Sequence, residues 1–252
     1  MSGISNSMLK SVKALHQKKA RDQHGLFIVE GDKMVREAID SPFDVVNVFR
    51  REDIGDDAMA RISALANPSP ALAVVRKPED SYVDDPSVLQ PVLSEGGLFL
   101  ALDTIRDPGN LGTILRIADW FGIKAVFAAH DTVDVFNPKV VQATMGAIFR
   151  VKLHYVDLPA LAEMALSAGG KVYGTFLDGG NIYQRELTDG ADGTPAVIVI
   201  GNESNGISQE MAALVSDRLY IPPYPSDDPG SESLNAAIAT AITVAEFRRR
   251  NY

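Results

Sequence analysis

The stretch GLFLALDTIRDPGNLGTILRIADWFG, residues 97–122, decides the fold that we expect for this chain. Its first seven residues are almost continuously apolar, as in a strand buried on both faces of a parallel sheet. A Pro-Gly turn follows, and Asn110 is of a residue type that commonly caps a helix. An apolar stripe then runs along the helix, formed by Leu111, Ile114, Leu115, Ala118 and Phe121. This succession of strand, turn and helix predicts an open α/β sheet.

The rest of the second half of the chain continues this alternation. We expect further strands at 125–129, 149–155, 171–179, 196–203 and 218–223, and helices at 158–168, 207–215 and 233–250. The pattern predicts a parallel-sheet α/β domain. In such sheets ligands bind where the strands end, so the residues directly after each strand are the candidate site residues.

The first half of the chain predicts a smaller α/β domain. A basic helix is expected near 8–20, strands at 25–31, 43–50 and 71–78, and helices at 32–40 and 56–66. The following stretch, 77–97, holds three prolines and several acidic residues, a composition typical of a linker. We therefore expect a first domain at 1–80, a linker at 81–96 and a second domain at 97–252.

Composition excludes several classes of protein. There is no cysteine, which excludes a disulfide framework and fits a cytoplasmic location, and the four histidines show no metal-ligand spacing. No run of about 18 apolar residues predicts a membrane span. The polar, basic start lacks the apolar core of a secretory signal. The net charge of −9 argues against a protein that coats nucleic acid along its whole surface.

One short segment departs from this acidic balance. Between residues 8 and 24, five basic side chains stand against a single acidic residue, Asp22; the five are Lys10, Lys13, Lys18, Lys19 and Arg21. The segment is either the solvated face of a helix or a local patch that contacts phosphate groups. Charge alone leaves both interpretations open.

Polar side chains follow three of the expected strands. Taken alone, Arg116 in the first helix would be an exposed surface charge. After the strand at 197–200, Gly201 would let a ligand approach the backbone closely. Glu203 follows at the mouth of the same strand, where a carboxylate is costly unless it is paired. Arg116 is the candidate partner for Glu203.

The third strand end leads into the C-terminal helix. We expect Ser233 to cap this helix, with Asn235 in its first turn, where backbone N–H groups are unpaired and can hold a polar ligand. Alanines recur at every fourth position, which indicates close packing against a neighbour; these are Ala237, Ala241 and Ala245. As a bare pattern, this segment indicates packing and says little about chemistry.

The order and spacing of the three strand ends resemble the SpoU/TrmH class of SPOUT RNA methyltransferases. NLGTILR, residues 110–116, is similar to the first motif of that family, N-x-G-x-x-x-R. IGNESNGIS, residues 200–208, is similar to the second motif, and IP followed by SESLNAAIATAI is similar to the third. GLFIVEGDKMVREAI, residues 25–39, resembles the small substrate-binding domain that often precedes the catalytic domain.

The resemblance implies a fold, a cofactor and partners. The catalytic domain would be a parallel α/β sheet with a deep trefoil knot, and the N-terminal domain would have a ribosomal-protein-like α/β fold that contacts RNA. S-adenosylmethionine would be the cofactor, and the protein would act as a homodimer with the active site at the interface. The five basic residues of segment 8–24 would then bind RNA.

The reaction that the resemblance implies is methyl transfer to a ribose 2′-hydroxyl of structured RNA, rRNA in preference to tRNA. Arg116 would hold an RNA phosphate and stabilise developing negative charge, because arginine binds phosphate in two-pronged fashion and stays protonated. Asn110 would orient Arg116 or the ribose, and Glu203 would pair with Arg116. Ser233 and Asn235 would order the third loop beside the substrate.

By the same resemblance, the cofactor pocket would be lined by Thr175, Phe176, Leu177, Ile200, Gly201, Asn202, Ile221, Pro222 and Leu234. Two departures from the family pattern concern its surroundings. The loop between Ile221 and Ser233 is longer than usual, and Gln142 stands where many relatives have arginine. Two alternatives stay open: an RNA-binding or ribosome-assembly factor without turnover, and a family enzyme that methylates a base.

Overall fold

The computed structural model describes residues 4–225 and 233–249. The chain forms two compact units. The first unit holds the chain up to Glu79 together with Asp134–Arg150, and the second holds Asp80–Val133 and the chain from Val151 onward.

The second unit is built on a parallel sheet of six strands. These are β4 (Gly97–Leu102), β5 (Val126–Ala128), β6 (Leu153–Tyr155), β7 (Lys171–Asn181), β8 (Pro195–Ile200) and β9 (Asp217–Tyr220). Their order across the sheet is β6-β5-β4-β8-β7-β9, and every neighbouring pair is parallel. The expected parallel α/β domain is confirmed, and β4 and β8 lie at its centre because both are apolar along their length.

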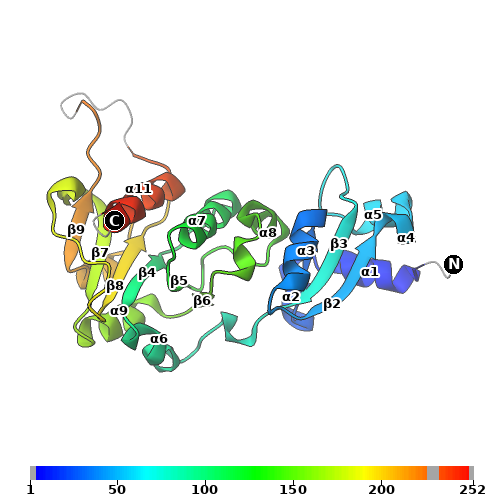
Figure 1. Cartoon of the computed structure of the whole chain (residues 1–252), viewed down its shortest axis with the longest axis horizontal. Helices are drawn as coiled ribbons and strands as arrows, with labels where there is room; N and C mark the ends of the chain where they lie inside the picture. Colours follow the sequence, from blue (N-terminus) through cyan, green and yellow to red (C-terminus); the bar gives the residue numbers. More distant parts are fainter. Residues whose placement is uncertain (1–3, 226–232, 250–252) are drawn as a thin grey trace. The chain divides into compact units, whose positions relative to one another are not determined.

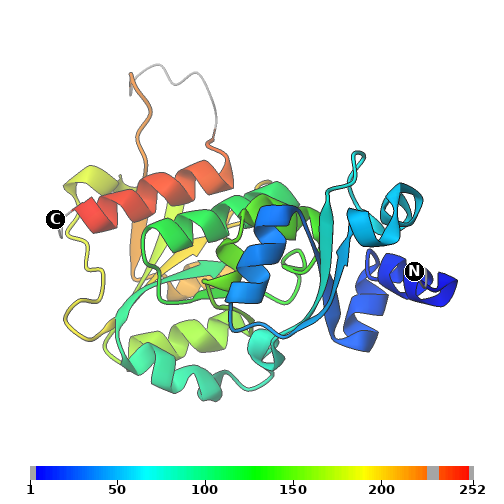
Figure 2. The same cartoon turned by 45° about the vertical axis from the view of Figure 1, so that its right-hand side comes forward.

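Helices cover both faces of this sheet (Figures 1 and 2). On one face lie α7 (Pro108–Trp120) and α11 (Ala236–Arg249), and on the other lie α6 (Gln90–Ser94) and α9 (Leu158–Ser167), with α10 (Gln209–Leu214) packed against α9. The apolar stripe of α7 is buried as its spacing predicts. Gly170, directly before β7, lets the chain approach the start of β8 closely, since a Cβ there would lie 2.2 Å from the carbonyl oxygen of Pro195.

Residues 81–96, which we expected to be a linker, are ordered and contribute to the core of the second unit. They contain the 3₁₀ helix η2 (Pro86–Leu89) and helix α6, after the 3₁₀ helix η1 (Glu79–Ser81). Val83, Leu89 and Leu93 are buried against the sheet face that α9 covers. Two of the three prolines that suggested a linker, Pro86 and Pro91, start these short helices, where a backbone N–H would have no helical partner.

The first unit has a three-stranded antiparallel sheet in the order β1-β3-β2, formed by β1 (Leu26–Glu30), β2 (Val45–Arg50) and β3 (Ala71–Arg76). Its helices are α1 (Asn6–Ala14), α2 (Lys18–His24), α3 (Asp32–Asp40), α4 (Arg51–Ile54) and α5 (Asp56–Ile62). The single helix expected near 8–20 is therefore two helices. α1 ends at Ala14, and α2 ends in a left-handed glycine, Gly25, with φ +63°.

A segment from the middle of the chain completes the first unit. Asp134–Arg150 contains α8 (Pro138–Thr144) and the 3₁₀ helix η3 (Ala147–Phe149). Phe136 packs against Phe27 with ring centroids 4.9 Å apart, and Phe149 packs against Phe43 at 5.3 Å. The boundaries expected from the sequence did not include this excursion. A local apolar pattern shows that a segment is buried, but it does not show which sheet the segment covers.

Candidate active site

Helix α7 begins earlier than expected, and this changes the role of Asn110. Pro108 occupies the first turn, and the side chain of Asp107 accepts a hydrogen bond from the Asn110 N–H at 2.8 Å. Asp107 is therefore the cap, and the prediction that Asn110 caps the helix is wrong. Proline fits the first helical position because it needs no hydrogen bond there. The carboxamide of Asn110 is consequently free for other contacts.

Asn110 joins the three strand-end motifs through its side chain. Its Nδ2 donates to Glu203 Oε1 at 2.8 Å, and its Oδ1 accepts from Asn235 Nδ2 at 2.8 Å. The residue is only 8% exposed. The carboxamide that does this is polar at both ends, so one side chain can bind an acceptor and a donor at once. The motifs are far apart in sequence, and the structure brings them together in one hydrogen-bonded row.

Asn235, and not Ser233, caps the C-terminal helix. Asn235 Oδ1 accepts from the backbone N–H groups of Ala237 and Ile238, at 2.9 and 3.3 Å, while its Nδ2 reaches Asn110. α11 accordingly starts at Ala236, and Ser233 lies before the helix with its side chain exposed. The Asn235 carboxamide caps the helix through its oxygen and bonds to Asn110 of α7 through its nitrogen. The shorter hydroxyl of a serine could not reach both partners.

Glu203 and Arg116 do not form the predicted pair. Glu203 is exposed and bonds to Asn110, so a partner is not needed to offset burial. Arg116 is also exposed, and its side chain forms no ion pair or hydrogen bond with a described residue. Arg116 lies six positions after Asn110, a spacing that turns their side chains to different sides of α7 and shifts them by about 9 Å along it. The guanidinium of Arg116 is therefore available to a ligand.

The loops after β4 and β8 are tied together by residues that the sequence analysis missed. Asp103 is buried at the end of β4 and accepts from the Ser208 N–H at 2.7 Å. Thr104 has a left-handed backbone, with φ +64°, which is rare for a β-branched residue. Its carbonyl accepts from Asn202 Nδ2 at 2.7 Å. A carboxylate directly after a buried strand was the available signal for Asp103.

Asn202 and Gly201 shape the loop after β8. Asn202 Oδ1 accepts from the N–H groups of Ser204 and Asn205, and its backbone pairs with Gly206. A Cβ at Gly201 would lie 2.3 Å from the carbonyl carbon of Gly206. Glycine is required at position 201 because the chain's own backbone approaches closely. Both residues hold the loop in a tight turn.

Most of the other residues predicted to line a cofactor pocket lie in or directly after β7, β8 and β9, whereas Leu234 lies just before α11. These strands are neighbours in the order β8-β7-β9, so Thr175 and Ile221 lie at the same edge of the sheet as Gly201. Leu177 is 72% exposed and Leu234 is 48% exposed, while Ile200 is buried. Half-buried are Thr175, Phe176, Ile221 and Pro222. An exposed leucine, Leu177, beside strand-end backbone groups suits a ligand with an apolar ring and polar edges.

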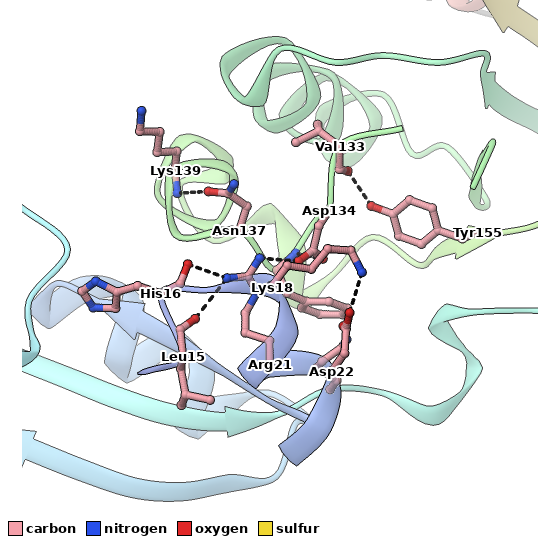
Figure 3. Close-up of polar contacts among 12 residues, drawn as sticks. Leu15, His16, Lys18, Arg21, Asp22, Val133, Asp134, Asn137, Lys139 and Tyr155 are labelled. Atoms are coloured by element: carbon pink, nitrogen blue, oxygen red, sulfur yellow. Dashed lines mark hydrogen bonds and ion pairs between the residues drawn. The ribbon is translucent and has the colours of Figure 1, made fainter. Parts of the chain in front are cut away.

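Arg21 is not part of an exposed basic surface. It is only 2% exposed, and its Nε and Nη2 donate to Asp134 Oδ2 at 3.0 and 2.5 Å (Figure 3). Its Nη1 donates to the carbonyls of Leu15 and His16, at 3.0 and 2.9 Å. The prediction that Arg21 contacts RNA is corrected: its guanidinium is buried inside the first unit, where its hydrogen bonds tie the α1–α2 turn to the Asp134–Arg150 segment.

The four lysines of the same segment are exposed. Lys10 and Lys13 lie on α1 and Lys18 and Lys19 on α2. Lys18 Nζ lies 2.6 Å from Asp22, which also bonds to Lys77 at 2.7 Å. Although partial burial acts in the opposite direction, the hydrogen bonds from Lys18 and Lys77 lower the pKa of Asp22 below its ordinary value. Part of the charge of Lys18 is thus neutralised at the surface.

Two other classes of site find no support in the described part of the chain. No helix there is long and apolar enough to cross a membrane. Nor do three or more histidine, aspartate or glutamate side chains gather there in a way that could hold a metal ion.

Comparison with known families gives two matches. A model described as the SpoU rRNA Methylase family matches residues 97–245, and one described as the MRM3-like substrate binding domain matches residues 6–74. Among curated proteins, the chain is similar to the 23S rRNA (guanosine(2553)-2'-O)-methyltransferase RlmP of Bacillus subtilis (strain 168). The two are 30% identical over 258 residues, which span 96% of each protein.

Two solved structures are similar over nearly the whole chain. One is a putative RNA methyltransferase of the TrmH family from Porphyromonas gingivalis, 36% identical, with a TM-score of 0.82 and coverage of 99% of this chain and 100% of that one. The other is the AdoMet-bound rRNA methyltransferase from Sinorhizobium meliloti, 28% identical, with a TM-score of 0.85 and coverage of 100% of this chain and 98% of that one.

Proposed function

Because the chain belongs to the SpoU rRNA methylase family, we propose that it transfers a methyl group from S-adenosylmethionine to a ribose 2′-hydroxyl of ribosomal RNA. Two relatives support this proposal: one is named as a 23S rRNA 2'-O-methyltransferase, and another was solved with AdoMet bound. The observation on this chain that carries the proposal is the hydrogen-bonded row Glu203–Asn110–Asn235, which joins three family motifs at one edge of the sheet.

In this proposal Arg116 binds the RNA phosphate beside the reacting hydroxyl. Its side chain is exposed and engages no described residue, so it can take a two-pronged hold on a phosphate. Arginine stays protonated, so Arg116 stabilises developing negative charge and does not accept the hydroxyl proton. The proton passes to the phosphate or to a water molecule.

Asn110 then acts as a hub that keeps the three loops in one arrangement. Through it, Glu203 and Asn235 are held at fixed positions before substrate arrives, which is how an active site reduces the cost of aligning its reactants. Asn235 fixes the start of α11 and so the end of the third loop, which Ser233 also borders. The pairing partner of Glu203 is Asn110 in place of Arg116.

The residues at the ends of β7, β8 and β9 fit S-adenosylmethionine in their chemistry. Exposed apolar side chains, Leu177 and Leu234, suit the adenine ring, and strand-end backbone groups suit its ring nitrogens and the ribose hydroxyls. The bound cofactor supplies an electrophilic methyl group on a sulfonium. The lining residues contribute orientation and exclude water from the neighbourhood of that methyl group.

We further propose a homodimer formed through the second unit, the trefoil knot of the family and a cytoplasmic location that gives access to ribosomal RNA. Two large apolar side chains on the α7 and α11 face support the dimer, since Trp120 is 84% exposed and Ile238 is 50% exposed. For the first unit, we propose that Lys10, Lys13, Lys18 and Lys19 contact RNA phosphates.

The experiment is a map of ribose methylation in the ribosomal RNA of the source cells, made with and without the gene. We expect one 2′-O-methyl group to disappear on deletion and to return with a plasmid-borne copy. An unchanged map with the protein absent would contradict the proposal. Loss of a base methyl group instead would assign the protein to base modification.

A further inference from the structure

A bulge in β7 carries two of the residues proposed to line the cofactor pocket. β7 pairs with β9 as far as Thr175, which lies opposite Leu219, and the pairing resumes at Gly180, which again lies opposite Leu219. Residues 176–179, among them Phe176 and Leu177, therefore loop out of the ladder. A bulge lacks the backbone hydrogen bonds of regular strands, so side chains have to fix its shape.

The end of the bulge folds back directly over β9. A Cβ at Gly179 would lie 2.6 Å from the carbonyl carbon of Leu219, so only glycine allows this approach. At the other end, the ring of Phe176 lies over Gly174, where a Cβ would come within 2.6 Å of it. The bulge is therefore packed tightly at both ends, although Leu177 between them is largely exposed.

One arginine on the neighbouring strand contacts both Phe176 and Asp178. Arg218 lies in β9 opposite Gly174, and its Cζ is 3.5 Å from the centroid of the Phe176 ring. Its Nη2 donates to Asp178 Oδ1 at 2.6 Å. Arg218 is thus the partner in every side-chain ion pair, hydrogen bond and cation–π contact that residues 176–179 make within the described part of the chain.

We propose that Arg218 is a positioning residue for S-adenosylmethionine, acting through Phe176 and Asp178; this inference rests on the proposed function. The guanidinium covers one face of Phe176 and so fixes the ring plane, because a planar cation stacks well on an aromatic face. Its bond to Asp178 fixes the opposite side of the bulge. Together the two contacts hold a wall of the pocket in place before the cofactor binds, which lowers the entropy lost on binding.

Asp178 also balances the charge of Arg218. An unpaired guanidinium near the pocket would repel the sulfonium of the cofactor, whereas an ion pair has little net charge. The hydrogen bond from Arg218 lowers the pKa of Asp178 below its ordinary value, so the carboxylate stays ionised at neutral pH. The wall is thus both rigid and nearly neutral.

The test is calorimetric titration of the whole protein with S-adenosylmethionine, with hydrogen exchange of the apo protein as a second readout. We expect Arg218→Ala to raise the dissociation constant about tenfold, and Arg218→Lys, which keeps the ion pair and loses the planar stacking, about threefold. Amides of 176–179 exchange faster in apo Arg218→Ala than in the wild type. Lys171→Ala is the matched control, because Lys171 is an exposed cation at the start of β7, outside the bulge, and its loss should leave affinity unchanged.

A second variant separates positioning from direct contact. Asp178→Ala removes a largely exposed side chain, so the protein keeps its fold, and we expect a weaker form of the same defect. The double variant should bind no more weakly than Arg218→Ala, because both changes release the same bulge. Additive losses, or unchanged affinity and exchange in Arg218→Ala, overturn the inference. Failure of the wild type to bind S-adenosylmethionine contradicts the proposed function itself, before any variant is compared.

Discussion

Two regions of the molecule each centre on an arginine that the sequence suggested for phosphate binding, and they differ in almost every physical respect. In the first unit, Arg21 is buried and gives four hydrogen bonds to Asp134 and to the carbonyls of Leu15 and His16. In the second unit, Arg116 is exposed on α7 and engages no described residue. The first arginine holds parts of the chain together, and the second is free to bind something else.

The difference shows what a cationic side chain in a sequence does not reveal. A buried guanidinium persists only where acceptors surround it, so its contribution is to folding, and removing one partner leaves an uncompensated charge. An exposed guanidinium with no partner contributes little to folding, so it can bind a ligand at little cost to stability. The roles of the two regions can be distinguished by experiment. A change at Arg21 should lower the free energy of unfolding, whereas a change at Arg116 should lower turnover and leave the free energy of unfolding nearly unchanged.

The largest effect is expected at Arg21. Arg21→Met leaves Asp134 buried without its cation and should lower the free energy of unfolding by about 3–5 kcal/mol, measured by urea denaturation. Arg21→Met with Asp134→Asn removes both charges and keeps an acceptor for the Phe136 N–H, so it should regain more than half of the loss. Lys19→Ala, an exposed change on the same helix, is the control. A stable Arg21→Met protein with weakened RNA binding would contradict this assignment, because Arg21 would then act in RNA binding and not in folding.

At Arg116 the effect should fall on the reaction. Arg116→Ala should lower methyl transfer about 100- to 1000-fold, the usual cost of losing one charge-stabilising donor. The free energy of unfolding should change by less than about 0.5 kcal/mol, because the side chain is exposed. Lys171→Ala removes an exposed cation at the start of β7, away from the strand ends, and should leave turnover unchanged. Undiminished turnover in Arg116→Ala would contradict the assigned role.

Asn110 differs from both arginines, because it is buried like Arg21 and yet is expected to affect turnover like Arg116. Asn110→Asp places a carboxylate against Glu203, and it should lower turnover about tenfold or more at neutral pH. Combining Asn110→Asp with Glu203→Gln restores a donor and an acceptor across the same contact, so part of the turnover should return. Equal turnover in the single and double variants would show that the row of hydrogen bonds is not what aligns the site.

The smallest effects are expected for the exposed lysines of the first unit. Lys13→Ala should weaken binding to a ribosomal RNA fragment about threefold and reduce the salt dependence of binding by about one ion. Lys18→Ala should have less effect, because Asp22 already neutralises part of its charge. Filter binding at several salt concentrations measures both quantities. A larger loss of RNA affinity for Lys18→Ala than for Lys13→Ala would contradict the expectation that Lys13 contributes more to RNA binding.

Much of the fold could be predicted because local patterns carry it. The helix at 32–40 has the expected bounds, and strands β1, β4 and β8 follow from short apolar runs. The packing of Asp134–Arg150 on the first unit could not be predicted, because it depends on long-range contacts such as Arg21 with Asp134. The ordered structure of residues 81–96 also depends on long-range contacts. The prolines of this segment start short helices, and the helices are buried only because they pack against the sheet.

The site was predicted more through resemblance than through local rules. Motif positions placed Asn110, Glu203 and Asn235 after three strands that are far apart in sequence, and the structure brings these three side chains together. Local capping rules assigned Asn110 and Ser233 to helix starts that Asp107 and Asn235 occupy. Several cap-forming residue types stand side by side at both places, and only the tertiary contacts decide which one turns toward the backbone.

The most direct test of the central claim uses purified protein, ribosomal RNA and S-adenosylmethionine with a labelled methyl group. After the reaction the RNA is digested to nucleosides and separated by liquid chromatography with mass spectrometry. We predict that the label appears in a single 2′-O-methyl nucleoside with the wild type and is nearly absent with Arg116→Ala. Label in a base-methylated nucleoside, or equal labelling by the two proteins, would contradict the claim.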